Sequence, residues 1–142
     1  MSSFVVENLE YLFWGFLFLV FVLIFYAFFK ILFSKKKLKS ADLKFISSKW
    51  RMVQSDLVSN PKLAVLEGDK LLDYTLAKLG KKGNLGDKLK KSGKYFSDLD
   101  GVWSAHKLRN KIAHEVSLNL SKGEVQRAIK KYERALKDLK AL

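Results

Sequence analysis

The stretch SKGEVQRAIKKYERALKDL, residues 121–139, carries the clearest helical signal in this 142-residue chain. Its apolar residues recur at intervals of three, four, three and four positions: Val125, Ala128, Tyr132, Ala135 and Leu139. This spacing puts them on one face of an α-helix. Ser121 and Glu124 match the S-x-x-E capping box that begins helices. The stretch therefore predicts an amphipathic helix that packs against a core.

The same spacing recurs upstream of this stretch. A helix that Ser40 is placed to cap has the apolar stripe Leu43, Ile46, Trp50, Val53 and Leu57. The sequence SNP at 59–61 ends this helix, and Pro61 suits the first turn of the next one. That second helix has the stripe Val65, Leu72, Leu76 and Leu79, and Gly80 ends it. We expect a further short helix at residues 87–92.

No stretch after Ser40 alternates with the period of two that is typical of strands. We therefore predict an all-α domain over residues 41–142, an up-and-down bundle of four or five helices with short loops. The chain contains no cysteine, so no disulfide supports this domain and packing alone must hold it together.

An uninterrupted apolar run, YLFWGFLFLVFVLIFYAFF, occupies residues Tyr11 to Phe29. As a helix it would be about 28 Å long, close to the thickness of a bilayer's hydrocarbon core. The preceding MSSFVVENLE has two glutamates and no Lys or Arg, which is unlike the basic start of a cleaved signal peptide. We expect a short N-terminal segment at residues 1–10 and a single transmembrane anchor at residues 11–33.

Lysines cluster directly after the anchor: Lys30, Lys35, Lys36, Lys37, Lys39 and Lys44. The positive-inside rule then places the N-terminus outside and the C-terminal domain in the cytoplasm, with a basic juxtamembrane linker at residues 34–40. The same lysines also suit contact with anionic lipids, so two interpretations stay open. The net charge of +13 favours anionic partners such as phosphate backbones or acidic lipid surfaces.

The stretch WSAHKLRNKIAHE, residues 103–115, predicts a helix with two different faces. One face carries Ala105, Leu108 and Ile112, and the other carries Trp103, His106, Asn110 and His114. Arg, Asn and His near a helix C-terminus can simply satisfy the last carbonyl groups and the negative end of the helix dipole. Arg109 lies about 140° from His114 around an ideal helix, so the two converge only across two chains or at a distorted helix end.

Within this stretch, LRNKIAHE resembles the Arg-polar-x-x-x-His signature of HEPN domains, a family of helical bundles that includes metal-independent endoribonucleases. The similarity covers about residues 41–142. AVLEGDKLLDYTLAKLG resembles an early helix of these bundles, LDGVWSAHKLRNKIAHE the motif helix, and SKGEVQRAIKKYERALKDL the closing helix.

This resemblance implies a homodimer in which two copies of the motif meet in a cleft and cleave RNA without a metal or other cofactor. Arg109 would neutralise the phosphate, Asn110 would orient it, and His114 would act as general base on a ribose 2′-hydroxyl or as acid toward the leaving oxygen. Histidine titrates near neutral pH, and arginine offers phosphate a planar set of donors that stays charged. Trp103 and His106 are expected to make dimer contacts.

Lys107 and Lys111 lie one turn apart beside this face and could guide an RNA backbone or simply face solvent. No metal site is expected, since His106 and His114 lie about 12 Å apart along one helix. Some HEPN domains bind or dimerise without cutting RNA. The sequence therefore leaves open whether the chain is an enzyme: it predicts an endoribonuclease or RNA-binding module, with a non-catalytic, membrane-tethered interaction or dimerisation module as the alternative.

Overall fold

The computed structural model describes residues 2–32, 36–115 and 118–142, and within them it contains helices and no strand. The predicted all-α class and the helical bundle are confirmed. The chain divides into two compact units, Met1–Lys35 and Lys36–Leu142.

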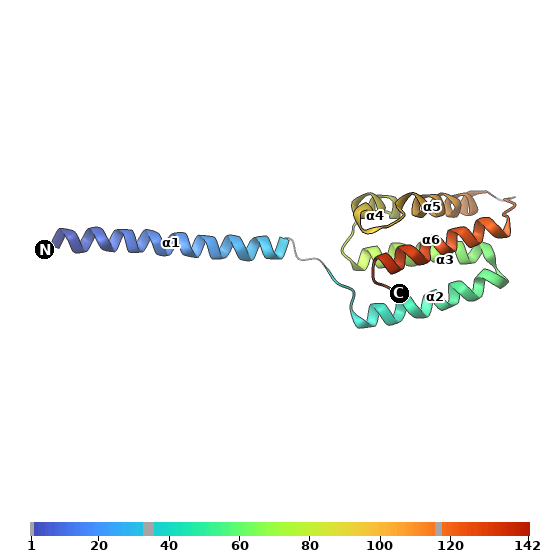
Figure 1. The fold of residues 1–142 in the computed structure, drawn as a ribbon, viewed down its shortest axis with the longest axis horizontal. Helices are drawn as coiled ribbons and strands as arrows, with labels where there is room; N and C mark the ends of the chain where they lie inside the picture. The colour runs from blue at the N-terminus through green and yellow to red at the C-terminus, as the bar shows by residue number, and fades with distance from the viewer. Residues whose placement is uncertain (1, 33–35, 116–117) are drawn as a thin grey trace. The chain divides into compact units, whose positions relative to one another are not determined.

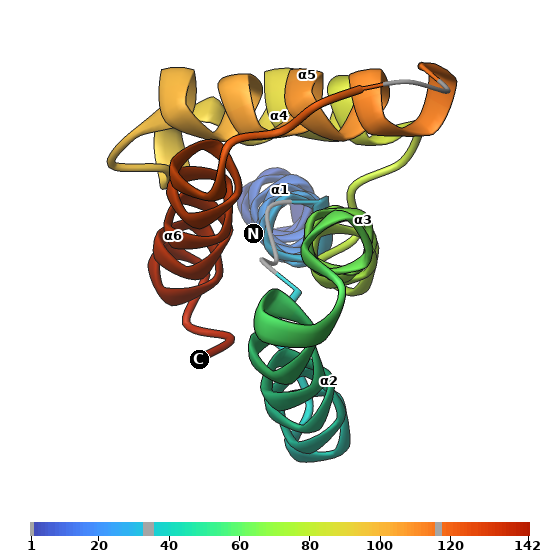
Figure 2. The ribbon, with the colours of Figure 1, turned by 90° about the vertical axis from the view of Figure 1, so that its right-hand side faces the viewer.

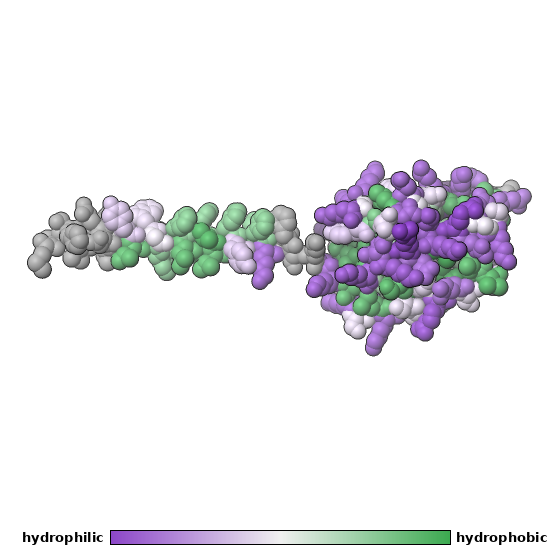
Figure 3. Space-filling view, viewed as in Figure 1, coloured by the Kyte–Doolittle hydropathy of each residue, from purple (hydrophilic) through white to green (hydrophobic). Residues whose placement is uncertain are grey.

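The first unit contains helix α1, Ser2–Leu32, which is longer than the expected anchor because the N-terminal segment continues the helix. Its stretch Tyr11–Lys30 has a mean hydropathy of 2.6 and is not buried, and Figure 3 shows a mostly hydrophobic surface along it. This helix is long and apolar enough to cross a membrane. Residue 33 of the expected anchor and residues 34–35 of the expected linker lie outside the described residues.

The second unit contains the other helices: α2 at Ser40–Ser59, α3 at Pro61–Lys78, α4 at Leu85–Ser92, the 3-10 turn η1 at Gly93–Tyr95, α5 at Leu99–His114 and α6 at Lys122–Asp138. Helix α3 contacts α2, α4, α5 and α6. Figures 1 and 2 show α3 and α6 between α2 on one side and α4 with α5 on the other. In Figure 2, α3 and α6 are seen nearly end-on, whereas α5 lies across them.

The helix starts follow local side-chain chemistry. The Ser121–Glu124 capping box forms as predicted, with Glu124 N–H donating to Ser121 Oγ at 3.2 Å. Asn60 caps α3 and Asn84 caps α4, so α4 begins two residues earlier than we expected. Ser40 does not cap α2. It is the first helical residue, and Lys39 occupies the cap position, where its backbone N–H donates to Asp42.

The predicted stripes form the core. All five apolar residues of the α6 stripe are buried, as are Ile46, Trp50 and Val53 of α2 and Val65, Leu72 and Leu76 of α3. Gly80, with a φ of 83°, adopts the left-handed conformation that ends α3. One residue on the α3 stripe is not apolar: Asp69 lies between Val65 and Leu72 with only 4% of its surface exposed.

Candidate functional site

The candidate site is built around the carboxylate of Asp69, in the middle of α3. Removing a charged carboxylate from water costs several kcal/mol unless partners compensate for it. Three side chains from two other helices supply this compensation: His106 and Arg109 from α5, and Tyr132 from α6.

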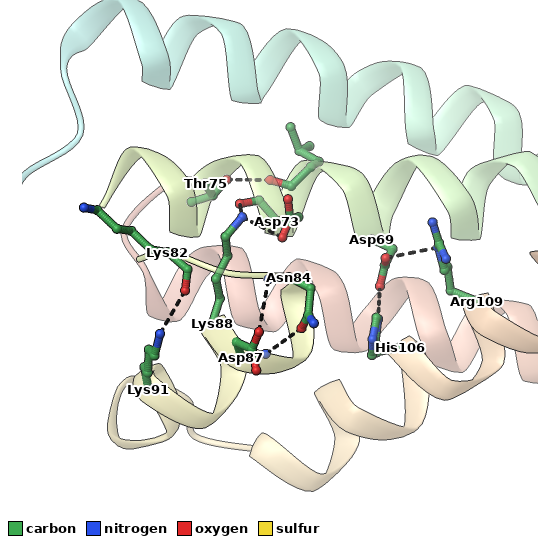
Figure 4. Close-up of polar contacts among 11 residues, drawn as sticks. Asp69, Asp73, Thr75, Lys82, Asn84, Asp87, Lys88, Lys91, His106 and Arg109 are labelled. Atoms are coloured by element: carbon green, nitrogen blue, oxygen red, sulfur yellow. Dashed lines mark hydrogen bonds and ion pairs between the residues drawn. The ribbon is translucent and has the colours of Figure 1, made fainter. Parts of the chain in front are cut away.

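The contacts of Asp69 use both of its oxygens. Oδ1 lies 2.8 Å from His106 Nδ1 and accepts a hydrogen bond of 3.0 Å from the Tyr132 hydroxyl. Oδ2 forms an ion pair with Arg109 Nε at 3.2 Å. Figure 4 shows His106 and Arg109 both pointing from α5 toward Asp69. An ionised carboxylate only accepts hydrogen bonds, so His106 carries a proton on Nδ1.

Tyr132 is fully buried, and burial followed by the negative charge of Asp69 raises its pKa well above the ordinary value. The hydroxyl therefore stays protonated and donates to Asp69. Its ring packs directly against the backbone of α3 at Gly68, where an added Cβ would lie 2.8 Å from Tyr132 Cδ2. Gly68 thus allows α6 to approach the carboxylate.

Asn110 extends the contacts to the next residue of α5. Its Oδ1 accepts a hydrogen bond of 3.0 Å from Arg109 Nη1, and its Nδ2 lies 3.4 Å from His106 Nε2. We call these five side chains, Asp69, His106, Arg109, Asn110 and Tyr132, the Asp69 network. Its α5 members are partly accessible, with 15% of the His106 side chain and 29% of the Arg109 side chain exposed.

The other candidate residues lie outside this network. Lys107, Lys111 and His114 are exposed, and α5 remains regular up to His114, where Glu115 N–H donates to Lys111 O at 2.8 Å. Trp103 is partly buried against the core, with its ring 6.0 Å from that of His106. Within one chain, the structure thus joins Arg109 to His106 and Asn110 and leaves His114 at the exposed end of the helix.

Asp69 was missed from the sequence, although a signal for it was present. Positions 65, 69, 72 and 76 follow the spacing of the buried stripe of α3, so a carboxylate at position 69 falls on the buried face. A buried carboxylate requires donors, and polar residues of α5 and the Tyr132 hydroxyl of α6 are available to supply them.

Two surface hollows lie away from this network. One, of about 400 Å³, runs between α2 and α3 past Phe45 and Met52, and the other, of about 760 Å³, lies beside the α2–α3 turn near Leu120. Neither is lined by Arg109 or His114. Among the described residues, no cluster of three or more His, Asp or Glu is arranged to hold a metal ion.

Comparison of the chain with models of protein families, with curated proteins and with solved structures finds no match. The similarity to HEPN domains thus remains one of motif and helix order, and the assignment of Arg109, Asn110 and His114 stays a prediction.

Proposed function

We propose that residues 36–142 form a HEPN-like module that acts on RNA as a homodimer, and that α1 anchors this module in a membrane. The apolar length of α1 supports the anchor, and the net charge of +13 supports an anionic partner. In this function the bundle lies on the cytoplasmic side.

One observation carries the proposal: the Asp69 network fixes Arg109 and Asn110 on α5, while His114 remains exposed on the same helix. Arginine has five N–H donors. Nε is paired in charge with Asp69 but makes no hydrogen bond to it, and Nη1 donates to Asn110. Donors on Nη2 remain for a phosphate. A guanidinium held in place by neighbours loses little further freedom when it binds a ligand.

A homodimer would bring Arg109 and His114 to the same phosphate. Arg109 turns inward toward α3, and His114 is exposed five residues later, so one subunit does not direct both groups at one phosphate. In a homodimer, Arg109 of one subunit and His114 of the other would contact the same phosphodiester. Closed two-fold pairing would create two such sites.

The chemistry would be transesterification within RNA. The ribose 2′-oxygen forms a bond to phosphorus as its proton passes to a general base, and the bond from phosphorus to the 5′-oxygen breaks as that oxygen receives a proton. His114 would serve as the base or the acid, since an imidazole can do either near neutral pH. Arg109 would stabilise the charge that develops on the phosphate oxygens. The products are a 2′,3′-cyclic phosphate and a 5′-hydroxyl.

The competing function is a non-catalytic, membrane-tethered interaction module. The observation that favours it is the ion pair itself, because Asp69 already compensates the charge of Arg109. In this function the Asp69 network only joins α3, α5 and α6, and the exposed end of α5 contacts a protein partner.

Cleavage by the full chain in detergent micelles distinguishes the two functions. We expect end-labelled RNA to be cut in the presence of a chelator, to leave cyclic phosphate ends, and to resist cutting when the 2′-oxygens are methylated. His114→Ala should lower the rate by about 10²-fold or more. Arg51→Ala, which removes a charge from an exposed site on α2, should cut like the parent. Equal cutting by His114→Ala, or no cutting by the parent, contradicts the nuclease.

Mixing two inactive variants tests the shared site. Arg109→Lys retains a charge for Asp69 but lacks the planar donor set, and His114→Ala lacks the imidazole. If each site takes Arg109 and His114 from different subunits, a mixed dimer has one intact site, so equal mixing should restore about a quarter of the parent activity. If both groups act within one subunit, mixing restores nothing.

A further inference from the structure

Exposed lysines gather at the end of the bundle where the chain enters it. They come from the segment before α2, the loop between α3 and α4, and α4 with η1. We call this surface the basic end and define it by Lys36, Lys37, Lys82, Lys90, Lys91 and Lys94. In Figure 1 the start of α2, the end of α3 and helix α4 lie at this same end of the bundle.

Contacts between these segments hold the basic end together. The Lys36 side chain lies over Gly80, where an added Cβ would be 3.0 Å from Lys36 Cδ. Lys91 Nζ donates to Lys82 O at 3.0 Å (Figure 4). The Tyr95 ring lies 5.5 Å from Lys94 Nζ and 5.2 Å from the ammonium of Lys81. Lysines that are distant in sequence are thus part of one folded surface.

The carboxylates nearby are engaged elsewhere. Asp42 pairs with Lys78 at 3.0 Å, Asp73 pairs with the buried Lys88 at 2.8 Å, and Asp87 completes the capping box of α4. In the described part of the chain, no ion pair joins a carboxylate to any of the six lysines of the basic end. The surface therefore carries a positive charge that nearby carboxylates do not offset.

The covalent link between α1 and this surface is short. Lys36 follows Leu32, the last residue of α1, by four residues, which span at most about 14 Å even when fully extended. The Debye length at physiological salt is about 8 Å, so a charged bilayer surface attracts these lysines in those arrangements of the tether that bring them within this distance. This step depends on the proposed membrane insertion of α1.

We propose that the basic end binds the anionic phospholipid surface of the membrane that holds α1, and so fixes which end of the bundle faces the lipid. Helix α5 begins beside α4 and ends at the opposite end of the bundle (Figure 1). Docking through the basic end would direct the exposed end of α5, with Lys111 and His114, away from the bilayer. The tether favours lipid over RNA as the occupant, because it keeps the surface near the bilayer at all times.

The test uses the full chain in nanodiscs of phosphatidylcholine, with or without phosphatidylserine. The chain contains no cysteine, so a dye can be placed at one introduced cysteine. Ala77→Cys reports from the end of α3 beside the basic end, and Ala113→Cys is the matched control, also an exposed alanine, at the end of α5. Energy transfer to a headgroup-labelled lipid measures how close each dye lies to the bilayer.

We expect phosphatidylserine to increase energy transfer from position 77 more than from position 113. The difference should vanish at about 1 M salt, where the Debye length is about 3 Å. Replacement of the six lysines by glutamine should also abolish it while the circular dichroism spectrum is retained. Equal transfer from both positions in both lipids overturns the proposal.

Two further outcomes distinguish the lipid proposal from a failure of the proposed anchor and from an RNA-binding role of the basic end. If the chain fails to co-elute with nanodiscs, the membrane insertion of α1 is wrong and the proposed anchor fails. If the six-glutamine variant keeps its response to phosphatidylserine but binds RNA at least tenfold more weakly than the parent, the basic end is an RNA surface and the lipid proposal is wrong.

Discussion

The two parts of the polar surface of α5 differ in their surroundings, although they carry similar residues. His106 and Arg109 turn toward Asp69 and share its buried charge. Lys111 and His114, at the end of the same helix, are exposed. Charge and hydrogen-bonding capacity alone thus do not tell which residues of a motif belong to the core. Substitutions in the first group should change the stability of the bundle, and those in the second group should change only what it binds or cleaves.

The largest effect should come from Asp69→Ala. Removing this carboxylate leaves His106 and the Tyr132 hydroxyl without their shared acceptor and Arg109 without its counter-ion. Loss of one partner of a buried ion pair costs about 3–5 kcal/mol. Denaturant unfolding of the full chain in micelles, followed by circular dichroism, measures this loss. Glu67→Ala, which breaks the exposed pair with Lys70 on the same helix, should cost no more than about 1 kcal/mol. Equal losses would mean that the Asp69 network adds no stability.

Gly68→Ala should have the next largest effect. The added methyl would lie 2.8 Å from Tyr132 Cδ2, so the ring or the helices must move, at a cost of about 1–3 kcal/mol. Gly123→Ala is the matched control within helix α6, because its Cβ would meet only Arg127 Nη1 at 3.5 Å. The control should stabilise the bundle slightly, since alanine favours helix. A neutral Gly68→Ala would show that α3 and α6 are not closely packed at this point.

The helices could be predicted from sequence because the spacing of apolar residues within each helix indicates which of its faces is buried. The stripe of α6 and its capping box need no knowledge of the other helices. The start of α2 was misplaced by one residue, because Lys39 has no side-chain oxygen that would mark it as a cap. Short-range patterns thus predicted the element order well and the element boundaries less well.

The Asp69 network depends on contacts that are distant in sequence. The Tyr132 hydroxyl meets Asp69 across 63 residues, and His106 meets it across 37. The periodicity of α6 predicted that Tyr132 lies in the core, but it predicted no partner for the Tyr132 hydroxyl. Asp69 was not identified from the sequence. Arg109 lies between the two faces of α5, and in the structure its side chain turns toward this carboxylate. The direction of the Arg109 side chain is therefore determined by the packing of α3 against α5 and α6.

Tyr132→Phe should have a smaller effect, which depends on pH. A hydrogen bond to a charged carboxylate contributes about 1.5–3 kcal/mol, and Phe removes only part of this because Asp69 keeps His106 and Arg109 as partners. Burial raises the folded-state pKa of Tyr132 above its ordinary value of 10.0, so the unfolded chain releases this proton first as the pH rises. The stabilisation is complete below about pH 10 and is lost above it. The difference in unfolding free energy between parent and Tyr132→Phe should therefore shrink above pH 10, and a constant difference would contradict the buried hydroxyl.

His114→Ala should have the smallest effect on stability. The side chain is exposed at the last residue of α5, so its replacement should change the unfolding free energy by no more than about 0.5 kcal/mol, mainly through the helix dipole. His106→Ala, the same substitution two turns earlier, removes a donor to the buried Asp69 and should cost more than 1 kcal/mol, about what the loss of a buried hydrogen bond costs. Parallel unfolding curves of the two variants measure this contrast between two histidines on one helix. Equal losses would mean that the end of α5 is also buried, for instance in a dimer interface. A lost cleavage rate in His114→Ala would then report a disrupted assembly, whereas with stability retained it reports the chemistry of the imidazole.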